Sequence, residues 1–83
     1  MFTVDWLPNA LAGLAAIWMI APDRAAVTAA ADTIDRLLAA NPFVHGVPVS
    51  EGLYVIEVPP LRALFEVDAT AGVVTVVSVN RLP

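Results

Sequence analysis

The alternation of apolar and polar side chains is clearest in the C-terminal half of the chain. Three runs rich in β-branched and aromatic residues follow one another with short breaks, at residues 53–58, 61–68 and 73–79. Such residues suit a pleated, half-buried surface, and short breaks make neighbouring strands antiparallel. Pro59 and Pro60 lack amide donors and so mark the first corner, while Gly72 can adopt positive φ and close the second. We therefore predict a three-stranded antiparallel meander.

The first residues show the same alternation on a smaller scale. Phe2, Val4 and Trp6 lie on one side of an extended chain, and Thr3 and Asp5 lie on the other. This pattern predicts an N-terminal strand. The pattern leaves two positions open for that strand, beside the last strand of the meander or in the middle of the sheet.

Residues 10–21 contain no polar side chain, and Pro8 and Asn9 before them suit the start of a helix, with Asn9 as the cap. One apolar stripe at helical spacing consists of Leu11, Leu14, Ile17 and Trp18. A membrane span needs about 20 apolar residues, and a secretory signal needs a positive start that is missing here. We interpret the segment as a helix buried on both sides, by its own sheet and by a partner.

A second helix is predicted from Pro22 and Asp23 to Asn41 and Pro42, with Asp32 and Arg36 forming an ion pair four residues apart. Its apolar stripe has clean helical spacing and consists of Val27, Ala30, Ala31, Ile34, Leu37 and Leu38. Residues 43–52 read as an irregular connector. The two helices should form an antiparallel hairpin across one face of the sheet, giving one α+β, two-layer domain over residues 1–83.

The composition indicates a protein partner and argues against binding to extended nucleic acid. Hydrophobic residues make up 59% of the chain, against about 45–50% in typical domains, so part of the apolar surface should face another chain. The net charge is −4 and lysine is absent, which opposes binding to extended nucleic acid. The absence of cysteine fits a reducing compartment, so a cytoplasmic location is expected.

Five short segments carry a likeness to a known family. They are TVDWLP at 3–8, AAIW at 15–18, IDRLL at 34–38, NP at 41–42 and LRALFEVD at 61–68. In this order they resemble the RelE/ParE superfamily of type II toxin–antitoxin toxins, which includes plasmid-stabilisation proteins. The resemblance covers almost the whole chain.

The resemblance implies a small toxin that is neutralised by an antitoxin wrapped over its surface. RelE-like members cut messenger RNA on the ribosome, whereas ParE-like members act on DNA gyrase and need no nuclease site. RelE-like cleavage uses the ribose 2′-hydroxyl with an arginine, a base and a C-terminal acid, often His or Tyr. Arg62 stands where the family's strand arginine stands, but residues 78–83 contain neither His nor Tyr.

The catalytic candidates are therefore few. Arg62 could stabilise phosphate charge with Glu51 or Glu57 as the base. The plainer interpretation pairs Arg62 with Glu57 or Glu66 on an exposed sheet face, where the pair contributes little to stability. His45 is the only histidine and reads as a solvated loop residue, so no metal site and no cofactor are predicted.

Partner-contacting candidates lie on the open side of the predicted sheet and on the first helix. Arg81 could join Arg62 in a small cationic spot, and Tyr54 is expected in the core or at an interface. The full set is Arg62, Leu64, Glu66, Tyr54, Arg81, Gly13 and Ile20.

Three functions remain open at this level. The predicted one is a toxin-family protein that acts by protein binding, on gyrase or the ribosome, and is neutralised by an antitoxin. The second is a non-toxic relative that serves as a homo-oligomerising interaction module. The third is a ribosome-dependent mRNA endoribonuclease, which the missing C-terminal acid disfavours, so enzyme activity is left undecided.

Overall fold

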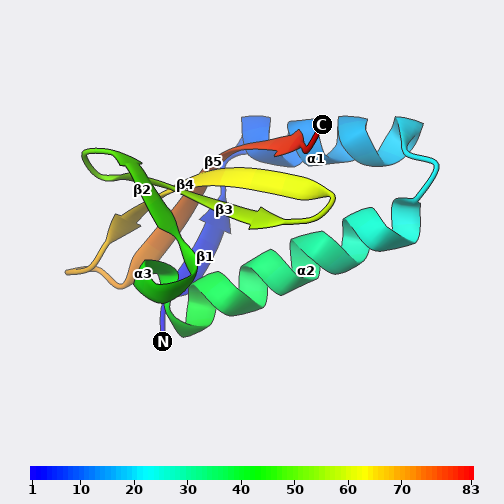
Figure 1. Cartoon of the computed structure of the whole chain (residues 1–83). Helices are drawn as coiled ribbons and strands as arrows, with labels where there is room; N and C mark the ends of the chain where they lie inside the picture. Colours follow the sequence, from blue (N-terminus) through cyan, green and yellow to red (C-terminus); the bar gives the residue numbers. More distant parts are fainter.

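The chain forms a five-stranded sheet with helices on one side (Figure 1). A computed structural model describes all 83 residues. The N-terminal half contains β1 (Thr3–Trp6), α1 (Pro8–Ile20) and α2 (Arg24–Ala40). The C-terminal half contains α3 (Pro42–His45), β2 (Val47–Ser50), β3 (Leu53–Val58), β4 (Leu61–Asp68) and β5 (Val73–Arg81). The strand order is β1-β5-β4-β3-β2.

The predicted meander is present, and β1 takes the first of its two expected positions. β3, β4 and β5 are antiparallel neighbours, and Gly72 has a φ of 70° in the second turn. β1 lies at the sheet edge and runs parallel to β5, with Thr3 opposite Val73 and Trp6 opposite Val76. The α+β, two-layer architecture predicted from the sequence is confirmed.

The prediction of an irregular connector at residues 43–52 was wrong. The Asn41 side-chain oxygen accepts hydrogen bonds from the amides of Phe43 (3.1 Å) and Val44 (3.3 Å), which starts the helical turn α3. β2 then pairs with β3 at the opposite edge of the sheet. Pro48 is tolerated because one side of an edge strand needs no hydrogen bonds.

One apolar cluster holds the two layers together. α2 contributes the predicted stripe, of which Val27, Ile34 and Leu38 are fully buried. The sheet side of the cluster consists of Ile56, Leu61, Ala63, Phe65, Val74, Val76 and Val79. The alternation in β4 therefore buries one set of side chains beneath the helices and leaves the other set on the open side of the sheet.

The two helices form a splayed hairpin. They diverge from the loop that joins them, with α1 along β5 and α2 across the other strands (Figure 1). Only Ala10 of α1 is buried, and the residues of the predicted stripe of α1 have different surroundings. Leu14 and Ile17 pack on the core, whereas Leu11 and Trp18 keep 51% and 42% of their surface exposed. None of the helices combines the length and apolar content needed to cross a membrane.

Two local predictions on the helices were also wrong. Asn9 does not cap α1, because its side-chain amide donates instead to the Val77 carbonyl at 2.9 Å. Asp32 and Arg36 do not pair, since Arg36 donates to the Thr33 hydroxyl at 3.2 Å. As a result Asp32 has no hydrogen-bond or ion-pair partner within the chain.

Arg24 closes the C-terminal end of α1. Its guanidinium group donates to the carbonyls of Trp18 (3.0 Å) and Met19 (2.7 Å) in the last helical turn, and the Trp18 carbonyl also accepts from the Ala21 amide (3.3 Å). The same group lies 4.4 Å from the centre of the Trp18 ring. This arrangement fixes the indole at the mouth of the space between the two helices.

Candidate functional site

The open side of the sheet carries the residues predicted for chemistry in rows set by strand register. Glu57, Arg62 and Asn80 lie opposite one another on β3, β4 and β5. The next row contains Val55, Leu64 and Ser78, and Glu66 lies in the row beyond, beside Thr75 and Leu53. The structure thus brings Arg62, Leu64 and Glu66 onto one surface.

Arg62 is engaged by the glutamate directly across from it. The distance between Arg62 Nε and Glu57 Oε2 is 3.5 Å, and the two side chains are 48% and 56% exposed. A solvated pair of this kind contributes little to stability. This is the exposed ion pair expected from the sequence, with Glu57 rather than Glu66 as the partner of Arg62.

The open side of the sheet carries a net negative charge. Asp5, Glu57, Glu66 and Asp68 all point to the open side, against one arginine, Arg62. Carboxylates in this excess repel a phosphate backbone. The surface is better suited to a protein partner with basic side chains than to RNA.

His45 joins this surface, which the sequence analysis did not predict. An open cavity of about 400 Å³ is lined by His45, Val47, Val55 and Glu57. The pairing of Val47 with Val55 carries His45 to this position, and the missed strand β2 explains why it was overlooked. The cavity lining therefore includes an imidazole and the carboxylate that pairs with Arg62.

The other predicted residues lie elsewhere. Glu51 is in the turn before β3, six residues before Glu57 in the sequence and outside the strand pairing that places Glu57 opposite Arg62. Tyr54 is on the helix side, where it stacks on Phe65 with 5.5 Å between ring centres. Gly13 faces β5, since a Cβ there would lie 3.6 Å from the Val79 carbonyl oxygen. Ile20, 86% exposed at the end of α1, faces solvent.

Arg81 does not form a cationic spot with Arg62, because it lies on the helix side of the sheet. A bulge in β5 changes the register between Ser78, which faces Leu64, and Val76, which faces Phe65. The extra residue, Val77, reverses the alternation beyond it. Arg81 accordingly donates to Asp23, with Nη2 and Oδ2 2.8 Å apart.

The Asp23–Arg81 pair predicts an acid-sensitive contribution to stability. The hydrogen bond from Arg81 lowers the pKa of Asp23 below its ordinary value, and the same bond raises the pKa of Arg81. A carboxylate with a lowered pKa stabilises the fold above about pH 4, and the contribution is lost as the pH falls through the lowered value. Urea midpoints of the wild type and Arg81→Gln should therefore differ modestly at pH 7 and converge at low pH. A difference that persists after Asp23 is protonated would contradict this.

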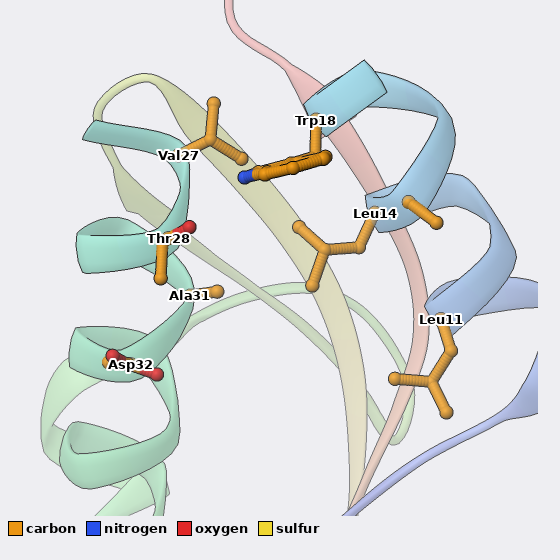
Figure 2. A pocket seen from close by; sticks show the side chains of 8 residues that line it. Leu11, Leu14, Trp18, Val27, Thr28, Ala31 and Asp32 are labelled. Carbon is orange, nitrogen blue, oxygen red and sulfur yellow. The ribbon is translucent and has the colours of Figure 1, made fainter. Parts of the chain in front are cut away.

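A second candidate surface lies between the two helices. A groove of about 360 Å³ is lined by Leu11, Leu14, Ala15, Trp18, Val27, Thr28, Ala31 and Asp32 (Figure 2). Apolar side chains of α1 form one wall, and the wall from α2 ends at the Asp32 carboxylate (Figure 2). Beyond the groove, Met19 and Ile20 are 68% and 86% exposed. No residue of α1 carries a charge, so this helix presents an uncharged surface to solvent.

Solved structures share the fold of this chain. The chain aligns with a chain of the RelBE2 toxin–antitoxin complex from Mycobacterium tuberculosis at a TM-score of 0.80 and 20% identity, covering 96% of this chain and 90% of that one. The chain has the RelE/ParE toxin fold. The chromosomal ParDE toxin–antitoxin system of P. aeruginosa aligns at a TM-score of 0.66 and 17% identity, with 100% and 98% covered. The intact RelBE toxin–antitoxin complex of E. coli aligns at 0.60 and 16%, with 100% and 99% covered.

The RelE/ParE fold inferred from five short segments is therefore confirmed. No protein-family model and no curated protein matches the chain by sequence. In this RelE/ParE fold the residue opposite Arg62 on the last strand is Asn80. A carboxamide cannot donate a proton as a general acid at neutral pH, so the end of the last strand offers no acid to Arg62.

Proposed function

We propose that the chain is a cytoplasmic toxin-family protein of a type II toxin–antitoxin system that acts by binding a protein target. An antitoxin would neutralise it by covering its exposed apolar surface. The similarity in fold extends over the whole chain, and the neighbouring structures from M. tuberculosis and E. coli are toxin–antitoxin complexes. These similarities support the class of protein.

The observation that carries a binding mechanism is the uncharged, exposed surface of α1. Met19 and Ile20 keep most of their surface in solvent, and Leu11 and Trp18 keep about half. Contiguous apolar surface on a small protein typically marks a protein interaction site. The acidic open side of the sheet supports the same mechanism, because it disfavours RNA as the substrate.

A second candidate function is RNA cleavage, and one observation favours it. His45, Glu57 and Arg62 supply an imidazole, a carboxylate and a guanidinium on one surface. In this scheme Glu57 would accept the 2′-hydroxyl proton, His45 would protonate the leaving oxygen and Arg62 would stabilise the charged phosphate. Three further carboxylates on the same surface oppose it. The remaining alternative, a non-toxic oligomerising module, would use α1 for self-association.

One growth experiment separates these functions. Induced expression of the wild type in a bacterial host should stop growth, and co-expression of the neighbouring gene should restore it. The variants Arg62→Ala and His45→Ala, both exposed and outside the core, should remain toxic, because binding through α1 does not need them. Growth curves and circular dichroism of the purified variants provide the readout.

The other outcomes assign the alternatives. Loss of toxicity in both folded variants, together with loss of ribosome-dependent RNA cleavage, would establish the endoribonuclease. Unchanged growth with the folded wild type would contradict a toxin and leave the interaction module.

A further inference from the structure

The groove between α1 and α2 has the size and lining of a small-molecule site. Its volume of about 360 Å³ lies within the range of about 300–1,000 Å³ found for such sites, which are mostly apolar with a few polar groups. Leu11, Leu14 and Trp18 belong to the apolar wall on α1 (Figure 2). The two polar residues of the lining, Thr28 and Asp32, are both on α2. Polar recognition in the groove is therefore confined to one wall.

Thr28 and Asp32 provide acceptors that the chain itself does not use. They are four residues apart, so they lie on the same side of α2, about 6 Å apart along its axis. Both are exposed, and neither side chain has a hydrogen-bond or ion-pair partner within the chain, since Arg36 donates to Thr33 instead. A carboxylate and a hydroxyl one helical turn apart can accept two of the three hydrogen bonds that a primary ammonium group donates.

The other end of the groove carries a positive charge. The Arg24 guanidinium lies 4.4 Å from the centre of the Trp18 ring and donates to the Trp18 carbonyl at 3.0 Å. Trp18 reaches toward Val27 (Figure 2), and Val27 and Asp32 are five residues apart, about 7.5 Å along α2. A cation is thus repelled from the Trp18 end and attracted to the Asp32 end. The groove has a direction, from an apolar end to an anionic one.

We propose that the groove binds a small primary amine with an apolar, aromatic body. The body would lie against Leu14 and Trp18, and the ammonium group would donate to the Asp32 carboxylate and the Thr28 hydroxyl. A butyl chain between a phenyl ring and the nitrogen covers the distance between the two ends. This ligand site goes beyond the proposed function and does not depend on it, because it uses only residues of the groove.

Other occupants do not match the same charges. A second copy of the chain would offer α1, which has no charged residue and so no cation for Asp32. A quaternary ammonium compound has no N–H to donate, and the Trp18 ring that could bind it through a cation–π contact already carries Arg24. An anionic ligand would be repelled by Asp32.

NMR titration of the isotope-labelled full chain with phenylbutylamine tests the inference. A ligand of this size should bind with a dissociation constant on the order of 1 mM, and the largest chemical-shift changes should be at the amides of residues 28–32 and the Trp18 indole N–H. Neutral phenylbutanol has the same shape but should bind about fivefold more weakly, because it lacks the charge that pairs with an exposed carboxylate. The trimethylated amine should bind as weakly as the alcohol.

Matched variants locate the effect. Asp32→Asn should remove the preference for the amine over the alcohol. Asp35→Asn should keep it, because Asp35 accepts a hydrogen bond from Trp6 Nε1 at 2.8 Å, outside the groove lining, and an amide oxygen can replace that acceptor. Ala15→Leu should weaken both compounds, because a larger side chain on the apolar wall fills the groove without changing its charge. Circular dichroism confirms that each variant is folded.

Equal affinities of the wild type for the amine and the alcohol would overturn the inference, and so would a preference for the amine that survives in Asp32→Asn. Shift changes centred on the open side of the sheet would overturn it too, because they would place the amine at other carboxylates. Groove resonances that move with protein concentration in the absence of ligand would assign the groove to a second copy instead. Amine binding by a chain that does not inhibit growth would remove the toxin function and leave the ligand site standing.

Discussion

Phe65→Ala is expected to lower the free energy of unfolding by about 3–5 kcal/mol, the cost of truncating a buried phenylalanine and leaving a cavity. Phe65 is 0% exposed at the centre of the core cluster. Its ring stacks on Tyr54. Tyr54 in turn contacts Phe43, and Phe43 contacts Phe2, so the four rings form a continuous row of aromatic contacts. An 83-residue domain has a total stability on the order of 4–12 kcal/mol, so the variant should lose a large part of its stability. Urea denaturation followed by circular dichroism measures the change.

Phe43→Ala provides the comparison. Phe43 belongs to the same aromatic chain but is 48% exposed. Its truncation should cost less than about 2 kcal/mol, because only part of the ring is removed from water by folding. Equal losses in the two variants would show that Phe65 is not the centre of the packing.

Gly46→Ala is expected to destabilise the chain by about 1–3 kcal/mol through overpacking. A Cβ on Gly46 would overlap the Phe65 ring and would lie 2.8 Å from the Pro42 carbonyl oxygen. The ring is buried and the carbonyl belongs to α3, so neither can move away easily. Thermal and urea unfolding should both show the loss of stability, and the NMR resonances of neighbouring His45 should shift.

Gly13→Ala is the matched control with the opposite sign. Its Cβ would lie 3.6 Å and 3.7 Å from atoms of Val79, which are ordinary contact distances. Alanine in a helix interior is about 0.5–1 kcal/mol more favourable than glycine. The same chemical change should therefore stabilise at one position and destabilise at the other, and two changes of equal sign would contradict the packing described.

The regular elements with clear periodicity could be predicted from the sequence. α2 alternates a narrow apolar stripe with charged residues, so both its boundaries and its buried face followed from spacing. The meander followed in the same way, because β4 alternates Leu61, Ala63 and Phe65 with Arg62, Leu64 and Glu66. The placement of Arg62 on the open side came from this alternation alone.

α1 could be located but not oriented. Residues 10–21 have no polar side chain, so no face of the helix is distinguished from any other by sequence. The predicted stripe contains residues that pack on the core, such as Ile17, together with Leu11 and Trp18, which line the groove. The direction of an evenly apolar helix is set by its neighbours.

The candidate site was only partly predictable, because two tertiary features decide it. β2 is exposed along its whole length, so it lacks the alternation that identifies a half-buried strand, and His45 was misplaced with it. The second feature is the register of β5, which set Arg81 against Asp23 and Asn80 against Arg62.

The bulge at Val77 has a consequence for divergence within this fold. Because Val77 is the additional residue, its deletion would restore simple alternation in β5 and leave every later residue on its present side. A β5 that kept Val77 but paired with β4 without the bulge would instead exchange the sides of the later residues. Arg81 would then lie on the open side with Arg62, and Asn80 would turn toward the helices, without a replacement at either position.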